Sequence, residues 1–352
     1  MKKIIILILS AALIAGCFSA CSSGAKAGVS STSNGASSKK IHIVTTIFPE
    51  YDWVMNVLGT DSKDVEVTML LDNGVDLHSY QPTADDILKI STCDLFIYVG
   101  GESDEWVEDA LKEALNKNMT VLNLLDILGE SVKEEEMVEG MQEEEHDHHH
   151  DENEDHDKDH DDHDHEHEDE DGETEYDEHV WLSLKNAETI VASIREALIK
   201  LDSENAEKYN SNAKAYSDKL KELDSRYQET VKTASVKTLL FGDRFPFRYL
   251  VDDYGINYYA AFVGCSAETE ASFETITFLS GKVDELSLNA VMTIEGTDHR
   301  IAETIVRNTK SKNQKILTLD SMQSTTLKDV QNGTTYISVM EKNLEALKEA
   351  LK

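Results

Sequence analysis

Short apolar runs alternate with helix-like stretches between residues 41 and 125. Four runs of β-branched or aliphatic residues predict strands over 41–47, 65–71, 95–99 and 121–125. Between them, the stretches PEYDWVMNVLG, TADDILKI and SDEWVEDALKEALNK place apolar residues three and four positions apart, which predicts helices. Thr83 and Ser103 are the predicted N-caps. This alternation is typical of a parallel sheet covered by helices.

A run of about fifty residues without proline or glycine, 184–233, is rich in good helix formers. A break is predicted at 202–205, where Ser203 to Ala206 reads as a capping box that opens a second helix. That helix, ending near Val231, is expected to span about 40 Å at 1.5 Å per residue. It is long enough to join two domains.

After residue 233 the alternation of strand and helix resumes. Strands are predicted at 238–241, 256–262, 290–294 and 316–319, and helices at 247–253, 272–286, 301–309 and 336–351. The predicted fold is therefore α/β, with two Rossmann-like lobes that hold parallel sheets and are joined by a long helix. We expect an N-terminal lobe at 40–184, a helical segment at 185–233 and a C-terminal lobe at 234–352.

The N-terminus has the pattern of a secretory signal peptide over residues 1–16. Lys2 and Lys3 precede an apolar run that leads into IAGC and is too short to span a membrane. The last four residues resemble a bacterial lipobox, which predicts that Cys17 is acylated, and Cys21 is a weaker alternative. Residues 17–39 read as a lipidated flexible tether. We therefore expect the protein to be extracytoplasmic and anchored by lipid to a bacterial cell membrane.

The stretch from Glu143 to Gly172 carries nine of the thirteen histidines and no apolar residue. Eighteen acids against one lysine give it −17 of the chain's net charge of −36, so it cannot form a core and nucleic acid is an unfavourable partner. It is expected to be the centre of a disordered loop, 134–178, that collects zinc or nickel weakly at many sites. The alternative is a solvated acidic linker. The accessory ligands are His146, His148, His149, His150, His156, His160, His163, His165 and His167.

Polar clusters follow the predicted strands, where ligands bind in open α/β sheets. Between two lobes these strand ends can face one cleft, so the side chains are candidate metal ligands. His42, on a strand among apolar neighbours, is instead predicted to be structural or exposed. The clusters contain His78 in DNGVDLHSYQPT, His179 in DEHVWLSL, Asp243 and Arg244 in GDRFPFRYL, and Asp298 and His299 in EGTDHR.

The chain resembles the zinc- and manganese-binding solute-binding lipoproteins of metal ABC importers. The resemblance rests on the lipobox at Cys17, the histidine-rich acidic loop, and the motifs VDLHSYQPT, GGESDEWVEDAL, DEHVWLSLKNA and IEGTDHRIAETI. It implies a metal held in the cleft by three or four side chains, including His78 and His179. It also implies delivery of that metal to a membrane permease driven by a separate ATPase, and we expect a monomer. The chain has no GxxxxGK[ST] loop with which to power transport.

The third and fourth ligands stay open. The family's third ligand, a histidine or a glutamate, falls on Arg244, whose guanidinium cannot ligate a cation. Asp243 is the first substitute, or it pairs with Arg244. The fourth ligand falls on Asp298 or His299, depending on a one-residue gap. Cys265 would suit zinc as a thiolate, although an inert buried cysteine is an equal alternative. Whether Cys265 pairs with Cys93 is also open.

Zinc is favoured over manganese because imidazole suits zinc and carboxylates suit manganese. We expect a zinc-binding transport component and not an enzyme. One alternative is a secreted zinc enzyme, but the short-range HExxH pair typical of such sites is absent from the sequence. Another alternative is a surface zinc buffer or adhesin with no role in transport.

Overall fold

The computed structural model describes residues 40–60, 62–142, 175–266, 269–296 and 298–352. Lys39–Lys352 forms one compact unit. The predicted signal peptide, the tether with Cys17, and the nine loop histidines lie outside the described residues. Among the described residues, no helix combines the length and apolar character needed to cross a membrane.

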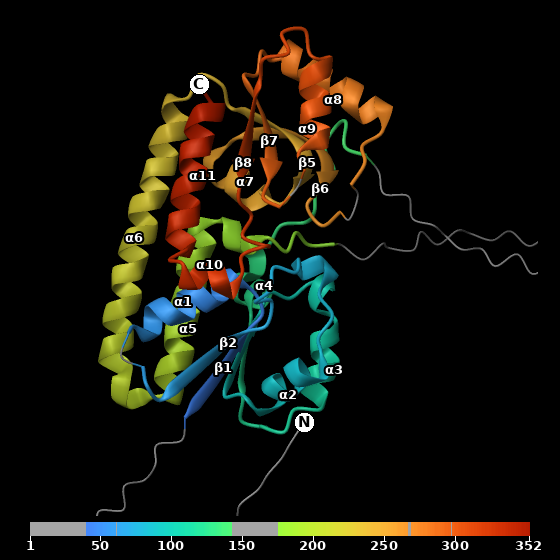
Figure 1. Ribbon diagram of the computed structural model, residues 1–352. Helices are drawn as coiled ribbons and strands as arrows, with labels where there is room; N and C mark the ends of the chain where they lie inside the picture. Colours follow the sequence, from blue (N-terminus) through green and yellow to red (C-terminus); the bar gives the residue numbers. More distant parts are fainter. Residues whose placement is uncertain (1–39, 61, 143–174, 267–268, 297) are drawn as a thin grey trace, which may run out of the picture. The chain divides into compact units, whose positions relative to one another are not determined.

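The first lobe contains a four-stranded parallel sheet in the order β2-β1-β3-β4 (Figure 1). Its strands are β1 (Ile41–Thr45), β2 (Val65–Met69), β3 (Leu95–Tyr98) and β4 (Thr120–Asn123). Ile43 pairs with Val67 on one side and Leu95 on the other. The predicted strand at 121–125 is wrong at its end: Asn123 accepts a hydrogen bond from Asp126 N and so caps a short helix, α4 (Leu124–Leu128).

Three further helices complete this lobe: α1 (Phe48–Leu58), α2 (Ala84–Thr92) and α3 (Trp106–Lys112). The prediction for Thr83 is confirmed, because its hydroxyl accepts from Asp86 N while the Asp86 carboxylate accepts from Thr83 N. The prediction for Ser103 is wrong. Ser103 lies in a 3-10 turn before α3, and its hydroxyl instead contacts a histidine described below.

Two long helices follow, α5 (Leu184–Leu201) and α6 (Ala206–Thr233), which confirms the predicted break. The break is not a capping box: Asn205 makes no side-chain cap, and the Asp202 carboxylate accepts from Asn205 Nδ2 and Tyr209 Oη at 2.7 Å each. Helix α6 has 28 residues, or about 42 Å at 1.5 Å per residue. It packs against α1 and α5 of the first lobe and α7 and α11 of the second, and so links the two lobes.

The second lobe repeats the first sheet's strand order as β6-β5-β7-β8. Strand β5 runs four residues further than predicted, because pairing resumes at Arg244 and Phe262 after an irregularity. Helix α10 was not predicted, since its short polar sequence has no apolar period. The strands are β5 (Thr238–Phe245), β6 (Asn257–Val263), β7 (Ala290–Ile294) and β8 (Lys315–Leu319). The helices are α7 (Arg248–Tyr254), α8 (Phe273–Glu285), α9 (Arg300–Asn308), α10 (Leu327–Gln331) and α11 (Tyr336–Ala350).

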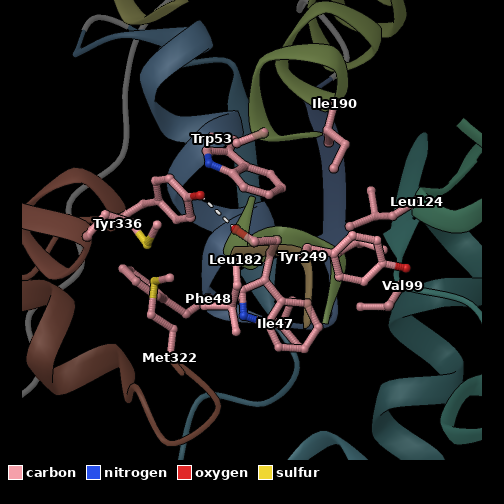
Figure 2. Packing of buried hydrophobic residues seen from close by; sticks show 14 of the residues in the cluster. Ile47, Phe48, Trp53, Val99, Leu124, Leu182, Ile190, Tyr249, Met322 and Tyr336 are labelled. Carbon is pink, nitrogen blue, oxygen red and sulfur yellow. Dashed lines mark hydrogen bonds between the residues drawn. The ribbon is translucent and has the colours of Figure 1, made fainter. Parts of the chain in front are cut away.

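One buried apolar cluster contains residues of both lobes (Figure 2). Trp53 of the first lobe packs edge-on against Tyr336 of the second, with ring centroids 5.2 Å apart. Tyr336 Oη donates to the backbone oxygen of Trp181 at 2.7 Å, and Trp181 Nε1 donates to Ser321 O at 2.8 Å. The lobes are therefore joined by a shared core as well as by α6.

The acidic loop is shorter than the predicted 134–178. Glu134 forms an antiparallel bridge with Tyr176, and Glu135 N donates to Glu175 O at 2.9 Å. Gln142 N donates to Ala261 O at 2.9 Å, which fixes the other described end of the loop against β6. Residues 134–142 and 175–178 thus belong to the fold, because their backbone groups have partners there.

Candidate metal centre

His78 follows β2 and lies in the 3-10 turn Leu77–Ser79. The Asp76 carboxylate accepts a hydrogen bond from His78 N at 3.1 Å and caps that turn. On the ring, Nδ1 lies 2.7 Å from Ser103 Oγ and 3.4 Å from Glu178 Oε2. In the tautomer that carries the ring proton on Nδ1, that proton is donated to the Ser103 hydroxyl and Nε2 keeps its lone pair for a metal.

His179 is held in the same manner from the other side. The Asp177 carboxylate accepts from His179 N at 2.8 Å and contacts ring Nδ1 at 3.1 Å. Trp181 lies beside the ring with centroids 5.2 Å apart, and His179 is fully buried. Each histidine stands two residues after an aspartate in the sequence. The carboxylate of that aspartate accepts a hydrogen bond from the backbone nitrogen of the histidine and so orients it.

The two rings point their free nitrogens at one another. His78 Nε2 and His179 Nε2 lie 3.1 Å apart, although the residues are 101 positions apart in the chain. In the tautomers that carry both protons on Nδ1, two lone pairs face each other, an arrangement that a cation between them stabilises. Zinc–nitrogen bonds of about 2.0–2.1 Å in a tetrahedral site separate two nitrogens by about 3.3 Å, so this pair needs little adjustment to hold zinc.

Burial keeps His78 in the form that binds metal. Burial first, and then the neighbouring His179, lower the pKa of His78 to about 3. Its imidazole is therefore neutral at neutral pH, as a metal ligand must be. Burial also raises the pKa of Glu178.

Arg244 closes one side of the centre and does not pair with Asp243 as the sequence allowed. Its guanidinium forms an ion pair with Asp76, from the other lobe. Burial opposes ionisation of Asp76, but Arg244 outweighs it, and the pKa of Asp76 lies below its usual range. The Asp243 carboxylate instead accepts from the backbone nitrogens of Arg244 at 3.0 Å and Ile294 at 3.2 Å.

Gln323 is a residue of the centre that the sequence did not point to. Its Nε2 lies 3.1 Å from His179 Nε2, and its Oε1 accepts from Ser321 Oγ at 3.0 Å and lies 3.4 Å from the Arg244 guanidinium. The sequence signal is weak, because Gln323 stands four residues after the predicted end of a strand, in a polar stretch. Only the fold brings it to His179.

Asp298 and His299 lie elsewhere in the second lobe. Together with Asp243 they line a hollow where β5 and β7 end, beside Gly242 and Gly296. Among the described residues, the group of candidate ligand atoms that lie within 4.8 Å of one another contains His78 and His179 but none of these three. Their role as metal ligands stays a prediction, and the geometry does not support it.

Cys265 does join the two histidines: its Sγ, with one nitrogen of each ring, forms that same group within 4.8 Å. Cys265 and Cys93 are both free thiols, so they form no disulfide with one another. Cys93 is buried in the first lobe, where its Sγ donates to Ile90 O at 3.2 Å. The sequence left open whether Cys265 pairs with Cys93, and the structure shows that it does not.

Gly264 permits the close approach of the Cys265 segment to His179. A Cβ at this position would lie 3.0 Å from His179 Cε1, 3.2 Å from His179 Nδ1 and 3.0 Å from Phe245 O. Because Nδ1 is the atom that Asp177 holds, a Gly264→Ala methyl is expected to displace the ring. We expect zinc affinity to fall about 10-fold, which is the lower end of the usual cost of removing a hydrogen-bond partner from a metal-binding histidine.

The matched control is Gly281→Ala, since a Cβ there meets no atom within 4 Å in helix α8. We expect it to leave zinc affinity unchanged and to raise the free energy of unfolding by about 0.5–1 kcal/mol. Both variants are compared by zinc titration against a competing chelator. Equal zinc affinities would show that the Gly264 contact does not position the ring.

The first lobe contains two buried carboxyl groups, Glu50 and Asp104, whose pKa values are raised. Glu50 Oε2 accepts from Thr46 N at 2.8 Å, Thr46 Oγ1 at 3.1 Å and Ile47 N at 3.3 Å. Burial first, and then Asp104, raise the pKa of Glu50 to about 8, while burial raises that of Asp104 to about 7. Glu50 therefore holds the start of α1 and carries its proton at neutral pH.

The raised pKa of Glu50 predicts a loss of stability with rising pH. Between about pH 4.5 and pH 8 the unfolded chain releases this proton while the folded chain keeps it, so the unfolding free energy falls as pH rises. We expect Glu50→Gln to remove that contribution, so that the variant gains on the parent between pH 5 and pH 8 in urea titrations. Glu274→Gln, at an exposed glutamate, is the control. If the unfolding free energies of Glu50→Gln and the parent differ by the same amount at pH 5 and at pH 8, the prediction is contradicted.

Comparison with protein families supports the same chemistry. The family model described as Zinc-uptake complex component A periplasmic (ZnuA) matches residues 43–350. The High-affinity zinc uptake system protein ZnuA of Bacillus subtilis is 31% identical over 344 residues, which cover 96% of each chain.

Two streptococcal comparisons show how much of a longer relative is matched. Zinc-binding protein AdcA of Streptococcus pyogenes serotype M18 is 32% identical over 321 residues, 88% of this chain but 56% of AdcA, so the chain spans little over half of that relative. The structure of the Zn(II)-bound ZnuA-like domain of Streptococcus pneumoniae AdcA has a TM-score of 0.65 at 28% identity, covering 89% of this chain and 99% of that one.

Proposed function

We propose, from the premise that this chain belongs to the zinc-uptake complex component A family, that it captures Zn²⁺ outside the cytoplasm for import. One observation carries the proposal: two buried or nearly buried imidazoles face each other with their Nε2 atoms 3.1 Å apart. Each ring is held through Nδ1 by an oxygen, which is the usual support of a zinc-binding histidine. Neutral imidazoles favour zinc over manganese.

The ion is the cargo of the protein. His78 and His179 hold it, and release passes it to a membrane permease driven by a separate ATPase. After removal of the signal peptide, the lipid on Cys17 anchors the chain to the outer side of the cell membrane, where it acts as a monomer. The family is one of metal-binding transport components, and we infer that the chain is no enzyme.

The histidine-rich loop serves as an accessory collector. It leaves the fold at Gln142 and returns at Glu175, four residues before His179. Tyr176 is tied to Glu134, and Asp177 holds the His179 ring, so the returning end leads directly into the centre.

The test uses the unit Lys39–Lys352 with its loop and a variant in which a Gly/Ser linker replaces residues 143–174. Both are titrated with zinc and, separately, with manganese in competition with a chelator. We expect one tight zinc per chain in both proteins, a set of weak sites only in the parent, and weaker binding of manganese. Absence of the tight zinc from the linker variant would overturn the cleft site.

Transport is tested in cells of the source organism that lack this chain. Expression of the parent is expected to restore zinc accumulation at low external zinc, whereas a His78→Ala/His179→Ala variant is not. Equal restoration by both proteins would contradict delivery from the cleft, and restoration by neither would contradict a role in import.

A further inference from the structure

The zinc centre has two imidazoles from the first lobe, and a third protein ligand must come from another segment. Zinc sites in proteins usually have three or four side-chain ligands. The second lobe presents Arg244 and Gln323 on one side. A guanidinium cannot ligate, and the Gln323 amide nitrogen is the atom that faces His179. That side of the centre offers hydrogen bonds and a positive charge in place of a zinc ligand.

The segment after β6, also in the second lobe, carries a thiol to the two rings. Cys265 Sγ and one nitrogen each of His78 and His179 lie within 4.8 Å of one another, the group of three that the described residues provide. Tetrahedral zinc with bonds of about 2.3 Å to sulfur and 2.0–2.1 Å to nitrogen separates these atoms by about 3.6 Å. A side-chain movement of about 1 Å completes the site.

Three independent contacts hold this segment in place. Val263 pairs with Phe245 at the end of β5. Gly264 lies against the His179 ring so closely that a Cβ there would lie 3.0 Å from Cε1. Cys265 N donates to Glu135 Oε1 at 3.3 Å, which ties the segment to the described base of the acidic loop. The thiol is thus positioned by the sheet, by a ligand ring and by the loop base.

We propose that Cys265 is the third zinc ligand of this chain and replaces the ligand that the position of Arg244 cannot supply. The proposal rests on the proposed function. When the zinc–sulfur bond forms, the thiol proton is released to solvent, and the thiolate offsets one of the two charges of the ion. A thiolate ligand favours zinc over manganese more strongly than a carboxylate in that position would.

The test follows the thiol itself, so it does not depend on transport. In the unit Lys39–Lys352 with the linker in place of residues 143–174, Cys93→Ala leaves Cys265 as the one remaining thiol. The rate of its reaction with a disulfide reagent is measured with and without one equivalent of zinc. Cobalt(II) is then added in place of zinc, and the near-ultraviolet thiolate-to-cobalt charge-transfer band is recorded.

We expect zinc to slow the reaction at least about 10-fold and cobalt to produce the band. Cys265→Ser is expected to lose the band and to bind zinc at least about 100-fold more weakly, the cost of losing one direct ligand. Circular dichroism and thermal melting without metal confirm that this variant is folded.

Two other outcomes overturn the proposal in distinguishable ways. If the protein binds one tight zinc, but the thiol stays reactive and no band forms, Cys265 is not a ligand and the zinc-binding function stands. If the protein with Cys265 intact binds no tight zinc at all, both the ligand assignment and the proposed function fail.

Discussion

Replacing His179 by alanine is expected to lower the zinc affinity of the centre by about 100- to 1000-fold. Apparent binding free energies of about 10–16 kcal/mol for zinc sites with four ligands correspond to about 2.5–4 kcal/mol for each ligand. That share equals a factor of about 100 to 1000 in the dissociation constant. His179 is the fully buried member of the pair, and its Nε2 faces His78 Nε2 at 3.1 Å, so no neighbouring water replaces it without rearrangement.

The measurement is a zinc titration of the linker variant in competition with a chelator, so that the loop histidines do not contribute. His42→Ala is the matched control, because His42 lies on β1 with its side chain 49% exposed and contacts Glu66. Asp177→Asn tests the support of the ring and is expected to cost about 10- to 100-fold. If His179→Ala binds zinc as tightly as His42→Ala, the ring has a structural role alone.

The second large effect is expected on stability. Tyr336→Ala should lower the free energy of unfolding by about 3–5 kcal/mol, the usual cost of removing a large buried aromatic side chain. Tyr336 is fully buried at the start of α11, packs edge-on against Trp53 and donates to Trp181 O at 2.7 Å. Tyr336→Phe keeps the ring and leaves Trp181 O without this donor, so we expect a smaller loss of about 1–3 kcal/mol.

Both variants are compared with the parent by urea denaturation, followed by circular dichroism and by tryptophan fluorescence. Phe273→Ala is the control for removal of an aromatic ring, because Phe273 is 84% exposed at the start of α8, and we expect a change within about 0.5 kcal/mol. Separate transitions for the two probes in the parent would show that the lobes unfold independently, against the shared cluster around Trp53 and Tyr336.

The fold was predictable from sequence because its strands are short apolar runs between helices with a clear apolar period. Predictions were less accurate where local and tertiary preferences compete. Leu124 continues an apolar run but begins a helix, because Asn123 caps it. Ser103 has the chemistry of an N-cap, yet its hydroxyl lies at the His78 ring. β5 extends to Phe245 because β6 pairs with it beyond the irregularity, which no local pattern reveals.

The candidate site was predictable in its histidines and not in its surroundings. His78 and His179 each stand in a specific motif, and the structure brings their rings together from positions 101 residues apart. The ion pair of Arg244 with Asp76 and the position of Gln323 depend on how the lobes face each other, and sequence spacing contains no information on that. Asp298 and His299 have ligand chemistry, but the end of β7 directs them to a different hollow.

The apolar cluster shared by the lobes limits how this protein can be divided or recombined. The two sheets have the same strand order, which suggests two exchangeable halves. Yet Tyr336 of the last helix lies against Trp53 of the first, and Trp181 is hydrogen-bonded to Ser321 across the lobes. A chimera that takes one lobe from a relative would therefore need to keep the first and last helices as a pair, because the boundary in the sequence at α6 is not a boundary in the core.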